Sequence, residues 1–254
     1  MDSSLGSNAI AIVDDVHFFG DRAAMALRAA FPEIQVHVFD RPRKLISSGL
    51  EFSHALVDLH FGKRDVDAFD PLARETESGV NAIDYLRWDQ PECNVAVVSI
   101  LSNGGPLIEE LARAVRSTWP DIPFLWKQNS MMSERLTRFV ETNHAPDNAE
   151  IKLILRDVVP VEPAIIRDQL RSSLYPGGTV RLLLALAEMP DPPSRAAAAA
   201  ALGITPHSVR NLADHCGRAL RAAKALGEDE QGGLARLWLW AHARRPILER
   251  WLAE

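Results

Sequence analysis

The first 142 residues alternate between short apolar runs and segments with helical periodicity. The apolar runs, each of strand length, are residues 8–13, 34–39, 54–59, 95–100 and 123–126. The helical segments that follow them are residues 20–31, 42–49, 80–88, 107–119 and 130–142. Strands that alternate with helices indicate parallel pairing, because each crossover helix returns the chain to the same edge of the sheet. We therefore expect an α/β fold with a five-stranded, doubly wound parallel sheet.

The remainder of the chain has no convincing sheet pattern. Helical periodicity covers residues 163–173, 179–188, 194–202, 206–225 and 234–253. The net charge also changes, from −9 over residues 1–150 to +3 over residues 151–254. An acidic part joined to a basic part suggests domains with different partners. We expect an α/β domain over 1–144, a linker and connecting helix over 145–175, and an all-α domain over 176–254.

The composition excludes several classes of protein. Of the 254 residues 47% are apolar and 24% are charged, which suits a folded core rather than a disordered chain. No apolar run approaches the roughly 18 residues that span a membrane. The two cysteines, Cys93 and Cys216, fall in different halves and imply neither a disulfide framework nor a cysteine zinc site. With no signal-peptide pattern at the N-terminus, these features predict a cytoplasmic protein without a membrane partner.

Carboxylates follow two of the predicted strands. Asp14 and Asp15 follow the first strand and Asp58 lies at the end of the third. Open α/β sheets bind ligands at this carboxyl edge. Clustered acids raise one another's pKa unless a cation neutralises them. Asp14, Asp15, Asp58 and the backbone carbonyl of His60 are therefore the expected ligands of Mg²⁺.

Two further side chains complete the set. Ser99 lies in the fourth strand and Lys127 follows the fifth. Asp58 would act as a nucleophile in phosphoryl transfer, while the metal ion and Lys127 offset the charge of the transferring group.

This set of residues, in this chain order, resembles the receiver domain of bacterial two-component response regulators over roughly residues 8–143. The resemblance implies a flavodoxin-like fold and a regulator rather than an enzyme. It implies that Asp58 is phosphorylated by a sensor histidine kinase or a small phosphodonor. Ser99 matches the hydroxyl residue that moves onto the phosphoryl group, and Phe124 matches the aromatic switch position.

Alternatives to phosphorylation remain open. Adjacent acids after a strand can simply cap a helix, in which case Asp58 would be a loop residue. Receivers usually have proline directly after the lysine, whereas this chain has Gln128, whose peptide bond we expect to be trans. Together with extra length around residues 62–78, this departure is the support for a second hypothesis, a pseudo-receiver that works without phosphate.

Residues 195–214 have the pattern of a helix-turn-helix. Gly203 marks a tight turn, Thr205 is a suitable N-cap, and Pro206 suits the first helical position. A shared small core is indicated by the spacing of Leu202, Ile204, Val209 and Leu212. The segment resembles the turn and recognition helix of LuxR/NarL-type regulators or of sigma-factor region four.

The outward positions of this motif are candidates for contacts to DNA. They are Thr205, His207, Ser208, Arg210 and Asn211, while Arg218, Arg221 and Lys224 lie further along, where they could reach phosphates. An ordinary helical hairpin, or a module that binds protein or RNA, is the alternative.

The last helical segment, residues 234–253, contains three tryptophans and is expected to bend or split at Pro246. The tryptophans would cover the core of their own domain or, alternatively, form a dimer contact. A twofold homodimer would match a palindromic DNA site.

Overall fold

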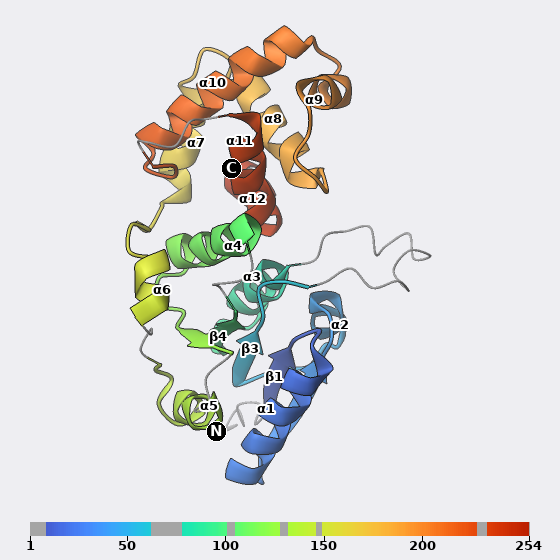
Figure 1. Ribbon diagram of the computed structural model, residues 1–254, viewed down its shortest axis with the longest axis vertical. Helices are drawn as coiled ribbons and strands as arrows, with labels where there is room; N and C mark the ends of the chain where they lie inside the picture. The colour runs from blue at the N-terminus through green and yellow to red at the C-terminus, as the bar shows by residue number, and fades with distance from the viewer. Residues whose placement is uncertain are drawn as a thin grey trace, which may run out of the picture. The chain divides into compact units, whose positions relative to one another are not determined.

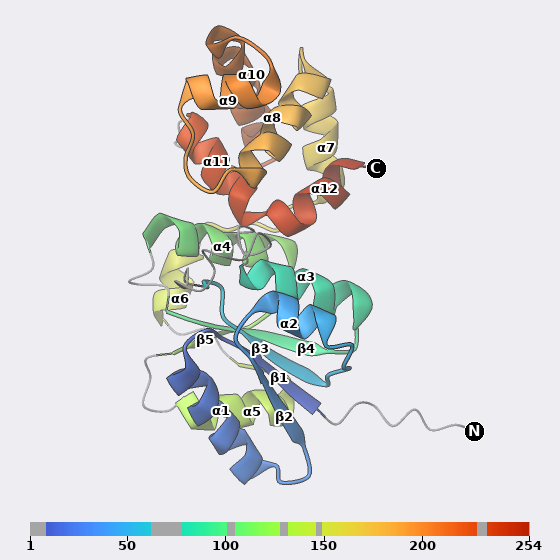
Figure 2. The same cartoon turned by 90° about the vertical axis from the view of Figure 1, so that its right-hand side faces the viewer.

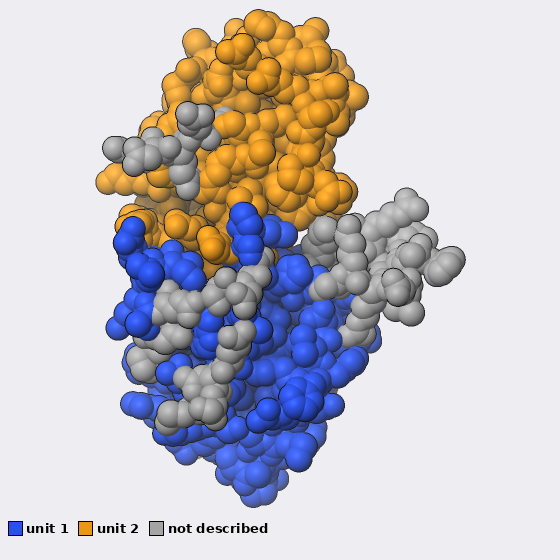
Figure 3. All heavy atoms as spheres, viewed as in Figure 1, with its two compact units in different colours: residues 1–108, 121–156 blue, residues 109–120, 157–254 orange. Residues whose placement is uncertain are grey.

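The computed structural model describes residues 9–61, 78–100, 105–127, 132–145, 149–227 and 233–253. The contacts within the chain divide it into two compact units (Figure 3). Unit 1 comprises residues 1–108 and 121–156, and unit 2 comprises residues 109–120 and 157–254. The domain limits expected from the sequence stay a prediction, and the packing adds that residues 109–120 belong with the C-terminal helices.

Unit 1 contains a five-stranded sheet in which every pairing is parallel. The strand order is β2-β1-β3-β4-β5, the doubly wound, flavodoxin-like order. The strands are β1 (Ala9–Val13), β2 (Gln35–Phe39), β3 (His54–Val57), β4 (Asn94–Ser99) and β5 (Phe124–Trp126). All five lie where the apolar runs predicted them, so the fold class is confirmed.

Helices cover both faces of this sheet (Figure 2). On one face lie α1 (His17–Ala30) and α5 (Met132–Thr142), whose apolar sides bury Leu27 and Phe139 against Ile10, Ile12 and Val98. On the other face lie α2 (Pro42–Ser47) and α3 (Gly79–Asp89) (Figure 2). Burial on both faces explains why the strands read as continuous apolar runs rather than as alternating ones.

Two helices depart from the sequence expectation. The short helix α6 (Ala149–Ile154) lies within the range expected to hold a linker and a connecting helix, but before the helical segment 163–173 that the sequence predicted (Figure 1). Helix α4 (Gly105–Thr118) begins in unit 1, but its residues from Glu109 onward pack within unit 2. An amphipathic pattern shows which side of a helix is apolar, but not which neighbour will cover it.

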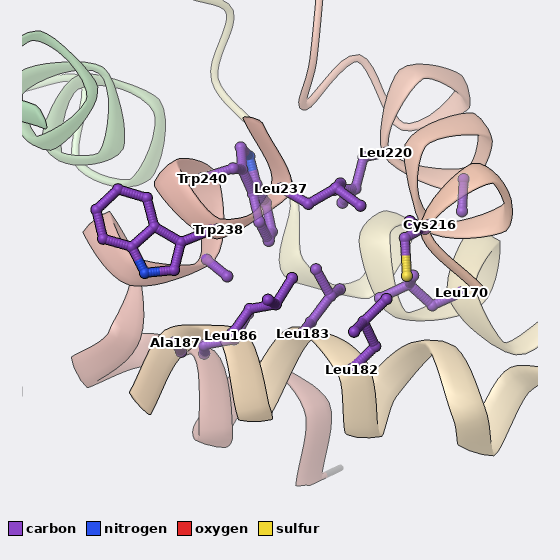
Figure 4. Packing of buried hydrophobic residues seen from close by; sticks show 14 of the residues in the cluster. Leu170, Leu182, Leu183, Leu186, Ala187, Cys216, Leu220, Leu237, Trp238 and Trp240 are labelled. Atoms are coloured by element: carbon purple, nitrogen blue, oxygen red, sulfur yellow. The ribbon is translucent and has the colours of Figure 1, made fainter. Parts of the chain in front are cut away.

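Unit 2 is a helical domain with a core of its own (Figure 4). Its further helices are α7 (Pro163–Arg171), α8 (Pro176–Glu188), α9 (Arg195–Leu202), α10 (Pro206–Ala222), α11 (Leu234–Ala243) and α12 (Arg245–Ala253). Leucines of α8 point toward Leu237 and Trp240 of α11 (Figure 4). The predicted split of the last helical segment is confirmed, and it falls at Arg244, two residues before Pro246.

The three C-terminal tryptophans are buried inside unit 2. Trp240 is fully buried and donates its indole N–H to the carbonyl of Ala225, at 3.1 Å. The indole of Trp238 donates to the carbonyl of Met189, at 2.8 Å, and Trp251 is also buried. Their role in the core is therefore confirmed. The alternative, a dimer contact through this helical segment, stays a prediction.

Cys93 and Cys216 are both free and buried. Among the described helices, none is both long and apolar enough to cross a bilayer.

Candidate functional site

The predicted site residues lie together at the carboxyl edge of the sheet. Asp14 follows β1, Asp58 follows β3, Ser99 ends β4 and Lys127 follows β5. The backbone N–H of Asp58 donates to the carbonyl of Val13 at 2.9 Å, which fixes the end of β3 beside the end of β1. Parallel register thus converts residues far apart in the chain into neighbours.

Asp58 is buried and hydrogen-bonded through both carboxylate oxygens. The hydroxyl of Ser99 donates to Oδ1 at 2.8 Å, and the backbone N–H of Leu59 donates to the same oxygen at 2.7 Å. The Nζ of Lys127 lies 2.5 Å from Oδ2. The predicted group of Asp58, Ser99 and Lys127 is therefore brought within direct contact, and their roles in phosphoryl transfer stay a prediction.

Lys127 connects the two buried acids. Its Nζ lies 2.7 Å from Oδ2 of Asp14 in addition to its contact with Asp58, and its side chain is 6% exposed. It also lies 5.0 Å from the centre of the Phe19 ring, a cation–π distance. Burial alone would lower the pKa of Lys127, but Asp58 and Asp14 outweigh it and hold the pKa above its ordinary value. The lysine is therefore charged at neutral pH.

The ionisation of Asp14 is perturbed by its surroundings. Burial raises its pKa to about 6, and the neighbouring carboxylate of Asp58 adds to that rise, while Lys127 opposes it. Its Oδ1 accepts a hydrogen bond from the backbone N–H of Val16, at 2.9 Å. A buried carboxyl with a pKa near neutrality is poised to exchange its proton for a metal ion.

The acids fit a divalent cation. Asp14, Asp15 and Asp58 each offer a carboxylate oxygen, and these three oxygens lie within 4.8 Å of one another. A hard cation such as Mg²⁺ prefers this donor set, with water filling the remaining positions. His60, whose backbone carbonyl is the fourth predicted ligand, pairs with Ser78 in an isolated antiparallel bridge. Metal binding by these four residues stays a prediction.

Gly79 is a site residue that sequence reasoning missed. It begins α3 and donates its backbone N–H to the carbonyl of Leu59, at 3.0 Å. A β-carbon on residue 79 would lie 1.9 Å from the carbonyl oxygen of Asp58. Ser78 and Asn81 form a capping box that fixes this start of the helix. In the sequence, the only sign of this role is a glycine directly before a helical run. The need for glycine comes from a contact with Asp58, which is 21 positions away in the chain.

The predicted switch residue, Phe124, is fully buried at the start of β5, where it pairs with Val97 of β4. Its role as a switch stays a prediction. Gln128, with its expected trans peptide bond, lies outside the described residues.

Helices α9 and α10 form the predicted helix-turn-helix. Gly203 ends α9 with φ of 66°, the left-handed region that glycine tolerates best. The N–H of Ile204 donates to Ala199 and that of Gly203 to Ala200, which makes this turn a Schellman motif. Thr205 begins α10 as an N-cap and accepts from the N–H of Ser208, at 3.2 Å.

The candidate DNA residues lie mainly on the outside of α10. Those at positions 205, 207, 210, 211 and 218 are exposed, whereas Ser208 is half-buried. The hydroxyls of Thr205 and Ser208 contact each other at 2.9 Å, so both also stabilise the helix start. Arg218 contacts His215 at 2.9 Å. Contacts of these residues to DNA stay a prediction.

Gly178 was also missed by the sequence reasoning. A β-carbon there would lie 2.8 Å from a methyl group of Leu212, which shows how closely α8 approaches α10.

No known protein-family profile matches the chain, and no curated protein matches it. Solved structures do. The promoter-bound response regulator RcsB of Salmonella enterica serovar Typhimurium, in the presence of the phosphomimetic BeF3⁻, is 15% identical with a TM-score of 0.48, over 93% of this chain and 98% of that one. Another RcsB–DNA complex is 17% identical with a TM-score of 0.44, over the same shares of the two chains.

DrrB of Thermotoga maritima, an OmpR/PhoB homologue, is 14% identical with a TM-score of 0.39, over 88% of this chain and 92% of that one. Scores this low carry no argument about function, which rests on the geometry of the two sites.

Proposed function

We propose that this chain is a DNA-binding response regulator that accepts a phosphoryl group on Asp58. The observation that carries the proposal is the environment of one carboxylate. Asp58 lies at the ligand-binding edge of a doubly wound sheet, with Ser99 at 2.8 Å, Lys127 at 2.5 Å and two further acids beside it. A simple helix-capping acid would need neither the buried lysine nor the hydroxyl.

The chemistry follows from these contacts. A carboxylate oxygen of Asp58 forms a bond to phosphorus as the bond between phosphorus and the donor breaks, which leaves an acyl phosphate. Mg²⁺, held by Asp14, Asp15, Asp58 and the carbonyl of His60, would supply charge neutralisation at the transferring oxygens. Lys127, which contacts Asp58 and is charged at neutral pH, would supply a second positive charge.

The phosphoryl group would change the partners of Ser99 and Lys127. Phosphorylation adds negative charge and strong acceptor oxygens at Asp58. The hydroxyl of Ser99 and the ammonium of Lys127, which both contact Asp58, would then gain a more strongly charged partner. A shift of β4 and β5 toward the phosphoryl group, including Phe124, would carry the signal to the DNA-binding helices and to a homodimer. The kinase that donates the group would be a sensor histidine kinase.

Labelling tests the first half of the proposal. The intact protein with Mg²⁺ and acetyl phosphate should gain the mass of one phosphoryl group. Asp58→Asn should abolish that gain. Asp40→Asn is the matched control, because Asp40 follows β2 at the same sheet edge but pairs with Lys44 instead of a serine and a buried lysine. Failure of the wild type to label would contradict the proposal and leave a phosphate-independent receiver as the alternative. Labelling that survives Asp58→Asn would contradict Asp58 as the acceptor.

DNA binding tests the second half. Preferred sequences are selected from a random DNA pool with the full chain, and affinity is then measured at several salt concentrations. Arg210→Ala and Asn211→Ala should each abolish the sequence preference, because both exposed side chains match base edges. Arg171→Ala at the end of α7 is the control and should retain it. A preference unchanged in both α10 variants would contradict α10 as the recognition helix.

A further inference from the structure

Unit 2 contains a cavity that none of the proposed functions uses. Its volume is about 380 Å³, within the range of sites for small molecules. The walls come from α4, from the segment 157–161, from the end of α10 and from α11. All of these segments belong to unit 2, so the cavity is formed within one compact unit. We refer to it as the cationic cavity.

The cationic cavity carries an excess of positive charge. Two acids, Glu110 and Asp157, face five cationic side chains, namely Arg113, Arg221, Lys224, Arg236 and Arg244. Charge of one sign around a concave site concentrates ions of the opposite sign. The lining therefore selects anions.

A single buried acid, Glu110, is shared by two of the arginines. Its carboxylate contacts Arg244 at 2.6 Å and Arg236 at 2.8 Å. Burial lowers the pKa of Arg244, and the nearby charges of Arg236 and Arg113 lower it further, against the effect of Glu110. The arginines are thus close enough to repel one another, and a bound anion would relieve that repulsion.

Lys224 is placed at the cavity by an uncommon backbone conformation. It follows α10 with φ of 57°, in the left-handed region that glycine and asparagine usually occupy at helix ends. A lysine in this conformation is strained relative to glycine. The chain nevertheless keeps an exposed lysine in the lining of the cavity.

The remaining wall is apolar. Val158, Val159, Val161 and Leu226 line the cavity beside the cationic side chains. Inorganic phosphate alone would leave these side chains uncovered, whereas an organic phosphate could place its charged group on the arginines and its body on the valines. Arginine is well suited to the first contact, because its planar fork matches phosphate oxygens.

We propose that the cationic cavity binds a small organic phosphate, with the phosphate group on Arg113, Arg221 and Lys224 and the apolar part against Val159 and Leu226. Arg221 and Lys224 thereby take a role different from the contacts to DNA phosphates expected from the sequence. A concave site with an apolar wall suits a small ligand better than a duplex backbone.

Calorimetry with pyrophosphate and with ADP tests this proposal on the full chain. EDTA is present so that divalent ions cannot bring either probe to the acids at Asp58. Both probes should bind saturably, and ADP should bind more tightly because it also covers the apolar wall. Absence of saturable binding by both would overturn the proposal, and tighter binding of pyrophosphate than of ADP would overturn the apolar subsite.

Variants of α10 locate the site. Lys224→Gly suits the left-handed backbone, so it should fold at least as well as the wild type and yet weaken ADP binding by about tenfold. Arg221→Gln should weaken ADP binding similarly. Arg218→Gln, on the same helix but outside the cavity lining, is the control and should leave ADP binding unchanged.

Two further outcomes separate this proposal from its rivals. Unchanged ADP binding in both Lys224→Gly and Arg221→Gln would overturn it. A second outcome would also overturn it: the wild type binds neither probe, and both variants lose affinity for DNA. Arg221 and Lys224 would then contact DNA. Asp58→Asn should bind ADP as the wild type does, which keeps this result independent of the phosphorylation proposal.

Discussion

Gly79 and Asp58 approach so closely that a β-carbon on residue 79 would lie 1.9 Å from the carbonyl oxygen of Asp58. Because the obstacle is backbone, no side-chain rotation can remove the clash. Gly79→Ala should therefore lower the free energy of unfolding by roughly 3 kcal/mol, at the upper end of the usual cost of overpacking. Urea denaturation monitored by tryptophan fluorescence measures this change.

Two other glycines provide controls for that substitution. Nothing lies within 4 Å of a β-carbon on Gly177 in α8, so Gly177→Ala should be neutral or slightly stabilising. At Gly178 the β-carbon would meet only the end of the flexible Leu212 side chain, at 2.8 Å, so Gly178→Ala should cost less than Gly79→Ala. Equal stability of Gly79→Ala and Gly177→Ala would refute the close approach.

Lys127 is the positive charge that allows Asp14 and Asp58 to be buried together. Lys127→Met would leave both acids without their cation, and breaking a buried ion pair in this way costs about 3–5 kcal/mol. We expect a loss of that size in the free energy of unfolding at neutral pH in EDTA. Mg²⁺ should restore part of it, since the same acids can bind the metal ion.

The ion pair between Lys44 and Asp40 provides the comparison. Its atoms are 2.7 Å apart, as close as those of the pair between Lys127 and Asp14, but the Lys44 side chain is 57% exposed. Lys44→Met should therefore change the free energy of unfolding by less than about 1 kcal/mol. If Lys127→Met and Lys44→Met lowered the free energy of unfolding equally, burial would not explain the contribution of Lys127 to stability.

The position of the site at the sheet edge could be predicted from the sequence. Asp14, Asp58 and Lys127 directly follow apolar runs and Ser99 ends one, and parallel strands place all their carboxyl ends at one edge. Periodicity and chain order were sufficient for this inference. The helix-turn-helix was predictable for a similar reason, because the left-handed turn at Gly203 and the N-cap at Thr205 are local features.

Features that depend on distant packing could not be predicted in this way. The contact of Gly79 with Asp58 joins segments separated by residues 59–78. The inclusion of Glu110 in unit 2 depends on Arg236 and Arg244, more than 100 positions away. Local patterns identify the apolar side of α4, but they do not identify the arginines that neutralise a buried acid on it.

The raised pKa of Asp14 predicts an unusual dependence of stability on pH. Its folded pKa, about 6, lies above the ordinary 3.8, so its contribution favours folding below pH 3.8 and is lost as the pH rises through about 6. Asp14→Asn lacks this titration. Between about pH 4 and about pH 7, the free energy of unfolding of the variant should therefore rise by roughly 2–3 kcal/mol relative to that of the metal-free wild type. Urea denaturation in EDTA measures the difference, and a difference independent of pH would contradict the raised pKa.

The affinity of the site for Mg²⁺ should increase with pH, whereas the contribution of Asp14 to stability without metal decreases. The metal ion binds the ionised carboxylate, so it must displace the proton of Asp14. Its dissociation constant should rise by up to about tenfold per pH unit as the pH falls below about 6, and change little between about pH 7 and about pH 8. Calorimetric titration with Mg²⁺ at each pH tests this, and an affinity that is constant down to about pH 5 would exclude Asp14 as a ligand.

The buried pair between Glu110 and Arg244 should be among the most sensitive positions of unit 2. Both side chains are 4% exposed, and Arg244 also contacts the carbonyl of Trp240 and the face of its ring. Glu110→Gln removes the charge that compensates a buried guanidinium, and should cost about 3–5 kcal/mol. Glu188→Gln is the matched control, because Glu188 pairs with Arg245 through two contacts of 2.6 and 2.8 Å but is 54% exposed. That control should cost less than about 1 kcal/mol, and equal losses in thermal or urea unfolding would show that Glu110 is not the charge on which Arg244 depends.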